Sequence, residues 1–551
     1  MNAPLFHRPV RLLPAIALCF LTLFSAFAAE KSTVPVRKQP KEAPAPPQIP
    51  KPPPEKKTAP DKKASPEKKA ATDKNSPAAK KAAENLLKLP PAPKVDWRPE
   101  YYQGRAYVPV EQVASYYDMQ KPQEEGKVIT LHNKNFTVEI TRGERRVKLN
   151  KWTFYFSFTV VQRSGKTLVS TFDVRNVLDP IMRPNDRRDP AVLKTVVIDP
   201  AGGGKETGIK SPFIAEKELT LDVATQLAEK LKAAGFRVVL TRDSDTLVSA
   251  AQRQKAADAV NDEAIFISLR ASSGSGTTRG FETCTLPPAG TPATNEADGA
   301  DIDRRFFAGN INDRESLALA TTLQSSAVTN LRTPDLGIKR FRFGELRDIN
   351  MPAVVCRMGY LSHKEEALKL STPEHRTQVA QSLFEGVQRY ARYLSDHLEE
   401  RLEEEKKRPL HLGTITATST VEGAGITGEQ MVLEVPIVAA ETVNVDRSRV
   451  EVQLFLFEHI DTGEIDVTTS DTPKVEWVSV LPDWKTSRTE LLRATYLRPP
   501  FGAAETKAYG KRSYHGYVAR LIYDGRVMDE ASSPPNLNRC LYYFTSVFPR
   551  R

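Results

Sequence analysis

The middle of the chain, residues 193–400, switches repeatedly between two hydrophobic periods. Short apolar runs with the length of buried strands are followed by longer stretches in which apolar residues recur every three or four positions. In one of these stretches, the apolar side chains of a single helical face are Leu219, Val223, Leu227 and Leu231. This alternation of strand and helix predicts a three-layer α/β domain. The predicted strands are 193–198, 237–241, 264–269, 280–286 and 353–357, and the predicted helices are 218–234, 250–260, 316–331 and 375–398.

The regions on either side of this domain have other patterns. Residues 95–185 run twice through a strand followed by a short helix, with alternating stretches between, which predicts a small mixed α/β module. Residues 413–551 hold at least five alternating or apolar strands and no helical period, which predicts an all-β, sandwich-like domain. The segment 401–412 begins with charged residues and is predicted to be a solvated helix extension and linker. Residues 287–306, rich in Pro, Gly, Asn and Asp, are predicted to form a surface loop.

The first 94 residues have the composition of targeting and linker sequence. Residues 1–28 have a basic start, an apolar run and a small-x-small ending, which predicts a secretory signal peptide. The alternative is a membrane anchor, but the apolar run is short for a spanning helix. Residues 29–94 are mainly Lys, Pro and Ala and are predicted to be a disordered linker. This linker is either a plain spacer or a cationic tether to anionic wall polymers.

Charge and cysteine content narrow the classes of function. The net charge is +11, but residues 30–94 carry 16 Lys and Arg against 7 Asp and Glu. Since Arg8 and Arg11 add two more positive charges, residues 95–551 are close to neutral. A basic nucleic-acid-binding domain is therefore excluded. Beyond the signal, the cysteines are three in number and without paired spacing, so no disulfide framework is expected even in an exported protein of the periplasm or cell envelope.

A series of short motifs marks the central domain. In chain order they are 197–200 (Val-Ile-Asp-Pro), 203–205 with Gly208, 216–221 (Glu-Lys-Glu-Leu-Thr-Leu), 238–243, 266–268 (Phe-Ile-Ser), 279–280, 351–354 (Met-Pro-Ala-Val) and 359–362 (Gly-Tyr-Leu-Ser). In order and spacing they resemble the zinc-dependent N-acetylmuramoyl-L-alanine amidases of the third type, with an AmiC-like catalytic domain. The resemblance implies an enzyme that cuts the amide between N-acetylmuramic acid and the stem peptide. In such a site three protein ligands hold zinc, and a carboxylate moves protons. Residues 95–185 resemble, more weakly, the copper amine oxidase N-terminal-like module, which implies an interaction module rather than a copper site.

The positions that the resemblance assigns to the zinc site are degenerate. It implies a His ligand at Gly202, a Glu ligand at Glu216, a second His ligand at Arg270 and a general base at Arg357. Only Glu216 keeps a suitable side chain. A guanidinium has five donors, no acceptor and a permanent charge, so it neither ligates zinc nor takes up a proton. We therefore expect no metal, no other cofactor and no working catalytic residue.

The same residues suggest how the site is rebuilt. We expect Glu216 to form an ion pair with Arg270 or Arg357, since an arginine would supply the charge that zinc otherwise brings. The alternative is that both arginines point into solvent. His363 could be a substitute ligand, but we interpret it as a surface residue. Cys356 could be a reactive thiolate, but we interpret it as a core side chain. The glycines at 202–205 could form a phosphate loop, but we interpret them as part of the amidase motif.

Three hypotheses of function follow. The first is an exported, peptidoglycan-associated pseudoenzyme whose cleft binds muropeptide, with envelope proteins as further partners, and which acts as a scaffold. The second is an active amidase with a rewired zinc site. The third is a purely structural domain with a filled cleft. Fold alone does not choose between them.

Overall fold

The structure is a computed structural model, and the part of it described here comprises 97–183, 191–298, 303–396, 398–421, 429–441, 443–468, 474–479, 482–498 and 502–541. The predicted signal peptide, 1–28, and the predicted linker, 29–94, lie outside these residues. No helix within the described ranges is both long enough and apolar enough to cross a membrane.

The central domain is built on a largely parallel sheet with the strand order β11-β10-β12-β15-β13-β14. The strands are β10 Thr195–Pro200, β11 Arg237–Leu240, β12 Ala264–Ser272, β13 Phe281–Thr285, β14 Asp335–Arg340 and β15 Ala353–Tyr360. The four strands from β11 to β15 are mutually parallel, and β13 runs antiparallel to β15. Every residue of β10 is buried, as expected for a parallel strand that is covered on both faces.

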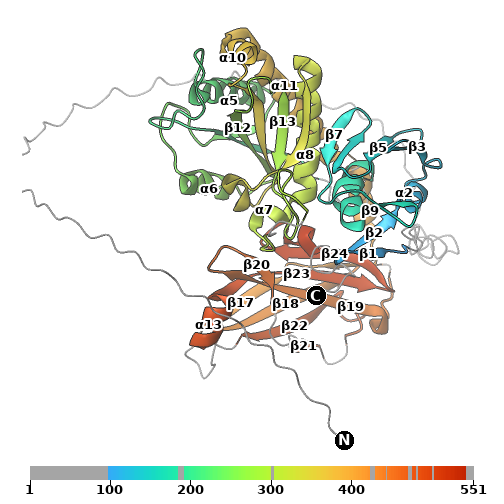
Figure 1. Cartoon of the computed structure of the whole chain (residues 1–551). Coiled ribbons are helices and arrows are strands. Elements are labelled where there is room, and N and C mark those ends of the chain that lie inside the picture. The colour runs from blue at the N-terminus through green and yellow to red at the C-terminus, as the bar shows by residue number, and fades with distance from the viewer. Residues whose placement is uncertain are drawn as a thin grey trace, which may run out of the picture. The chain divides into compact units, whose positions relative to one another are not determined.

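Side-chain alternation along the strands separates two hydrophobic layers. Val196 and Ile198 point into a core that contains the apolar faces of three long helices, whereas Val197 points into a smaller core on the other face. The long helices are α5 Glu216–Ala233, α8 Asp313–Leu331 and α11 Pro373–Ser395 (Figure 1). The other face is covered by α6 Ala250–Asp258 and α9 Gly344–Arg347, which contribute Ala257 and Leu346 to the smaller core. The remaining helices are α7 Ala308–Ile311, α10 Lys364–Ser371 and α12 Leu398–Lys406. The arrangement is the three-layer α/β pattern expected from the sequence.

The N-terminal module continues the same sheet. Its strand β7 pairs in parallel with β14 through Ile338 and Phe154, so the central strands and β7-β6-β5-β4-β3 form one sheet of eleven described strands. The meander strands are β3 Gln123–Glu125, β4 Val128–His132, β5 Thr137–Thr141, β6 Arg146–Leu149 and β7 Trp152–Tyr155. A second sheet consists of β1 Glu100–Tyr102, β2 Arg105–Pro109, β9 Lys166–Ser170 and β8 Val161–Arg163. The helical segments are α2 Val110–Tyr116, α3 Thr171–Asp173, η1 Val174–Leu178 and α4 Asp179–Met182.

The insert at 287–306 is only in part the surface loop that its composition suggests, because its first residues are buried. Thr291 and Ala293 are 1% exposed. Arg145 of the N-terminal module donates hydrogen bonds to the carbonyl oxygens of Ala293, at 3.1 Å, and Glu296, at 2.8 Å. Because these carbonyls receive a guanidinium rather than water, a loop of polar composition can pack inside the protein. The prediction of a surface loop was therefore wrong for residues 287–293, whereas Asn295, Ala297, Arg304 and Arg305 are exposed.

The C-terminal region consists of two antiparallel sheets. One contains β16 Leu410–Leu412, β17 Thr416–Val421, β18 Glu429–Ala439, β22 Thr489–Arg498 and β21 Lys474–Trp477. The other contains β20 Ile465–Val467, β19 Val450–Ile460, β23 Arg512–Tyr523 and β24 Arg526–Ser533. Side chains of both sheets, among them Val435, Leu492 and Leu521, share one core around the fully buried Trp484. A short helix, α13 Ala503–Tyr509, corrects the expectation of strands alone.

Candidate functional site

The site is organised around the carboxyl end of β10, where Asp199 is fully buried. One carboxylate oxygen of Asp199 accepts hydrogen bonds from the Thr241 hydroxyl, at 2.6 Å, and from the guanidinium of Arg253. The other accepts from the Ser268 hydroxyl at 2.8 Å. A buried carboxylate with this many donors is fully satisfied, so Asp199 fixes the ends of neighbouring strands rather than reaching into solvent.

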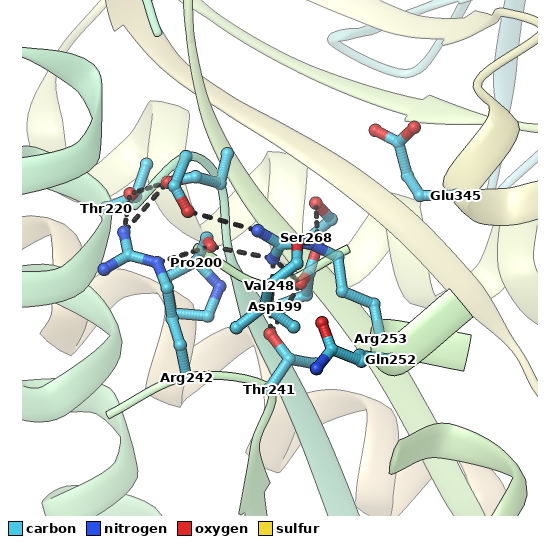
Figure 2. Close-up of polar contacts among 12 residues, drawn as sticks. Asp199, Pro200, Thr220, Thr241, Arg242, Val248, Gln252, Arg253, Ser268 and Glu345 are labelled. Carbon is cyan, nitrogen blue, oxygen red and sulfur yellow. Dashed lines mark hydrogen bonds and ion pairs between the residues drawn. The ribbon is translucent and has the colours of Figure 1, made fainter. Parts of the chain in front are cut away.

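Two buried arginines hold the turn that follows Asp199 (Figure 2). Arg242 donates to the carbonyl oxygens of Pro200, at 3.0 Å, and Ala201, at 2.9 Å. Arg253 donates to the carbonyl oxygens of Pro200, at 2.9 Å, and Gly202, at 3.1 Å. The turn that carries the first degenerate position is therefore bonded to the protein at three successive carbonyl groups.

Gly202 occupies a space in which a side chain does not fit. Its φ is +72°, in the left-handed region that favours glycine. A Cβ atom at this position would lie 2.7 Å from the carbonyl oxygen of Glu206 and 3.1 Å from Cβ of Lys217. The position is thus shaped for glycine, and a histidine here would require the turn to move.

Glu216, at the first position of α5, is 6% exposed and is held by backbone groups. Its two carboxylate oxygens accept hydrogen bonds from the N–H of Ala271 and the N–H of Ile209, both at 2.9 Å. Gly208 packs against the same carboxylate, since a Cβ on Gly208 would lie 2.2 Å from its oxygen. The surviving ligand position therefore has an internal structural role that needs no cation.

Arg270, near the carboxyl end of β12, pairs with Glu345 of α9 at an N–O distance of 2.5 Å. Its side chain is 31% exposed, and that of Glu345 is 16% exposed. The contact is ionic but poorly aligned, because the Glu345 oxygen forms no hydrogen bond in this geometry. The buried Nε of Arg270 likewise donates to no acceptor among the described residues.

Arg357, on β15, belongs to a buried polar network. It donates to the fully buried carboxylate of Glu282 at 2.6 Å. That carboxylate also accepts from the Tyr360 hydroxyl, at 3.1 Å, and from the ammonium group of Lys339. The guanidinium of Arg357 lies 5.0 and 5.1 Å from the ring centres of two phenylalanines, Phe341 and Phe343.

The ionisation of this network follows from its charges. Burial alone would raise the pKa of Glu282, but Lys339 and Arg357 outweigh burial and hold that pKa below its usual value. Burial alone would lower the pKa of Arg357, but its bond to Glu282 raises it. Burial and the Glu282 carboxylate raise the pKa of Tyr360. The network therefore stays ionised as a carboxylate between two cations, with a neutral phenol as a further donor.

Three of the four degenerate positions line one pocket. Arg270 and Arg357 are register partners on the adjacent parallel strands β12 and β15, and Glu282 is the register partner of Arg357 on β13. The pocket has a volume of about 380 Å³ and lies at the carboxyl ends of the parallel strands, where open α/β sheets bind ligands. Its lining residues are Gly208, Ile209, Glu216, Arg270, Ala271, Ser272, Ser273, Phe343 and Arg357. Gly202 is the one degenerate position that does not line it.

The expected ion pair of Glu216 with Arg270 or Arg357 does not form. Each arginine has its own carboxylate, Glu345 or Glu282, and Glu216 is satisfied by two backbone N–H groups. The physical reason is that a buried carboxylate at the start of a helix is stabilised by nearby backbone donors without a second charge. The alternative of arginines directed into solvent is also not what the structure has.

The other candidates have structural roles. His363 caps α10, its Nδ1 accepting a hydrogen bond from the N–H of Glu366 at 3.2 Å. Cys356 is fully buried, and burial raises the pKa of its thiol to about 12, opposite to the shift that a thiolate nucleophile needs. In the segment 202–205 the N–H of Gly203 bonds to a backbone carbonyl and that of Gly204 to Asp245, so these donors do not point at a phosphate.

The residues present do not fit the zinc ion that the family resemblance implies. Gly202 has no ligating atom and no space for one, Arg270 has only donors, and the Glu216 carboxylate is already bonded to two N–H groups. Across the described ranges, no group of three or more His, Cys, Asp or Glu side chains is arranged to hold a metal ion.

Two residues of the site were missed at the level of sequence. Glu345 lies in a stretch for which the hydrophobic pattern predicted no element, and its short helix has four residues. Glu282 lies in a predicted strand, and a charged residue inside an otherwise apolar buried strand was the available signal for a partnered carboxylate.

Comparison with known proteins identifies the family of the central domain. Residues 196–389 match the family model described as N-acetylmuramoyl-L-alanine amidase. The chain is 31% identical over 196 residues to N-acetylmuramoyl-L-alanine amidase CwlM of Bacillus licheniformis, covering 35% of this chain and 67% of that protein. It is 30% identical over 209 residues to N-acetylmuramoyl-L-alanine amidase LytC of Bacillus subtilis (strain 168), covering 38% of each, so the match spans less than half of LytC.

A further relative is the probable cell wall amidase LytH of Staphylococcus saprophyticus, which is 29% identical over 254 residues, covering 46% of this chain and 76% of that protein. The motifs around Asp199, Glu216 and Arg242 lie within the matched family region. The chain belongs to the N-acetylmuramoyl-L-alanine amidase family.

Proposed function

We propose that this protein is an exported, peptidoglycan-associated member of the family whose amidase-like domain binds muropeptide without hydrolysing it. The observation that carries the proposal is that the side chains at the zinc-site positions are already bonded to other groups of the protein. Arg270 and Arg357 are tied to Glu345 and Glu282, while Glu216 is tied to backbone N–H groups. Hydrolysis of an amide needs an activated water and a proton acceptor, and neither guanidinium provides one.

The pocket supports binding over a purely structural role. A filled cleft would leave no space beside Glu216, whereas an open pocket of about 380 Å³ lies there, at the small end of the range for small-ligand sites. The predicted signal peptide and the name of the cell wall amidase LytH support a location in the envelope. In this proposal the N-terminal module and the β-rich C-terminal region serve as interaction modules around the binding domain.

The competing hypothesis is an active amidase with a rewired zinc site. One experiment separates the two: the purified full-length chain is analysed for bound zinc by elemental mass spectrometry and incubated with purified peptidoglycan. We expect less than about 0.1 zinc per chain, as an order-of-magnitude threshold, because the ligands are absent. We also expect co-sedimentation with the wall and no released stem peptide. An active relative such as CwlM serves as the positive control for release.

The outcomes are distinct. Stoichiometric zinc together with peptide release would replace our proposal with the rewired enzyme. Failure to sediment with peptidoglycan even at low salt, where charge attraction is strongest, would favour the structural hypothesis.

A further inference from the structure

The pocket has an unusual set of donors. Two guanidiniums enter it from register partners on adjacent strands, Arg270 on β12 and Arg357 on β15. Strands in a sheet lie about 4.8 Å apart, so the two arginines start from neighbouring backbone positions, and each guanidinium contacts a carboxylate of its own, Glu345 or Glu282. An anion gains from these arginines only where a guanidinium has N–H donors left for it.

The two arginines differ in how far they are committed to the protein. Arg357 is fixed on three sides, by the Glu282 carboxylate and the rings of Phe341 and Phe343. Arg270 makes a single, poorly aligned contact with Glu345, and its buried Nε has no acceptor among the described residues. A guanidinium satisfies a carboxylate best through two parallel N–H bonds, and Arg270 has not formed that arrangement in the structure.

We propose that Arg270 is the carboxylate-binding residue of this pocket, that Arg357 reinforces it, and that Glu345 is an internal carboxylate which a ligand displaces. This inference rests on the proposed function, because it names the part of a muropeptide that the site recognises. The ligand class is a short peptide with a free carboxylate, since about 380 Å³ holds a few residues and the Phe343 and Ile209 side chains offer apolar contact.

The proposal makes Glu345 a competitor of the ligand. Its side chain sits on α9, in the segment between β14 and β15 that also carries Phe341 and Phe343. Removing the charge of Glu345 frees the Arg270 guanidinium without touching the pocket lining itself. Binding of an acidic peptide should therefore become tighter, a gain that misfolding does not produce.

The test measures binding of a fluorescent tetrapeptide to the full-length chain by fluorescence anisotropy. The peptide is of the wall-stem type and keeps its free carboxylates. The same peptide with every carboxyl group amidated is the second probe. We expect the acidic peptide to bind about 10-fold or more tightly than its amide, the ratio typical of a charged hydrogen bond. Glu345→Gln should bind the acidic peptide about 3- to 10-fold more tightly, and Arg270→Gln about 10-fold or more weakly. Lys148→Gln, which removes an exposed cation paired with Glu139 on the N-terminal module, should change nothing.

Several results would overturn the proposal. These are equal binding of the acidic and amidated peptides, no gain in Glu345→Gln, and a site that takes inorganic phosphate but not the acidic peptide. Co-sedimentation with peptidoglycan is measured in parallel. A chain that binds the wall but not the acidic peptide loses this inference and keeps the proposed function, whereas a chain that binds neither loses both.

Discussion

The buried carboxylate of Glu282 provides a direct measure of how much the rebuilt site stabilises the domain. Glu282→Gln keeps the size of the side chain and removes its charge. In the wild type this carboxylate is fully buried and accepts hydrogen bonds from Arg357, Tyr360 and Lys339. The variant leaves two cations close to an uncharged amide in the interior of the sheet.

The magnitude follows from burial. Removing one partner of a buried ion pair costs about 3–5 kcal/mol. The side chains of Arg357 and Lys339 are still 22% and 18% exposed, so water recovers part of their solvation, and we expect a loss near the lower limit, about 3 kcal/mol. For a domain of this size each kcal/mol moves the melting temperature by about 2–4 °C, so the expected decrease is about 6–12 °C.

The assay is thermal unfolding at pH 7, measured by calorimetry. Glu139→Gln is the matched control, because Glu139 forms an exposed ion pair with Lys148 at 3.3 Å, for which a loss below about 1 kcal/mol is expected. Since the folded-state pKa of Glu282 is lowered, its contribution to stability is fully present above the unfolded-state pKa of 4.5 and is lost as the pH falls further. The difference between wild type and Glu282→Gln should therefore shrink below pH 4.5. A melting shift no larger than that of the control would refute the reasoning.

Three further predictions concern other parts of the protein. Gly202→His should lower the free energy of unfolding by about 1–2 kcal/mol, because a histidine must adopt the left-handed backbone conformation of Gly202. It should leave the zinc content unchanged in elemental analysis, because a Cβ at Gly202 meets the Glu206 carbonyl oxygen. Arg145→Ala should expose the insert at 287–298 to limited proteolysis, which is read as a new cleavage there, since it removes the donors to the insert's buried carbonyl oxygens. Cys356 should resist a thiol reagent at pH 8 in the native chain and react after unfolding, because burial raises the pKa of its thiol to about 12. Modification of the native chain as fast as the unfolded chain would contradict the buried placement of Cys356.

Much of the fold of the central domain was accessible from the sequence. Strong hydrophobic periods located the long helices α5 and α11 and the buried strands β10 and β12, because burial on both faces leaves few polar residues in such strands. The pattern missed β14 and α10, which are short and partly exposed and therefore carry little period. It also gave no sign that β7 extends the central sheet, since backbone pairing between distant strands leaves no trace in local composition.

The residues of the candidate site were predictable from the sequence, but the groups to which they bond were not. The motifs located Gly202, Glu216, Arg270 and Arg357, and the structure brings the last three to one pocket. Charge alone suggested that an arginine would pair with Glu216, yet pairing depends on which donors lie within reach. The backbone N–H groups of Ile209 and Ala271 reach that carboxylate, and no rule of sequence spacing encodes that.

The contacts of the two arginines also bear on how the rebuilt site is held in place. Without the arginines, Glu345 would lose its charge partner and Glu282 would keep only Lys339, and buried carboxylates with too few partners are costly. Instead each carboxylate has a guanidinium, so replacing either arginine alone, even by the family's own residue, leaves a buried charge less compensated. The backbone at Gly202 adds a steric barrier that is independent of these charges. Restoration of a zinc site would thus require concerted changes in the turn after β10, in both strands that carry the arginines and in α9. No single substitution at these positions is therefore expected to restore zinc binding.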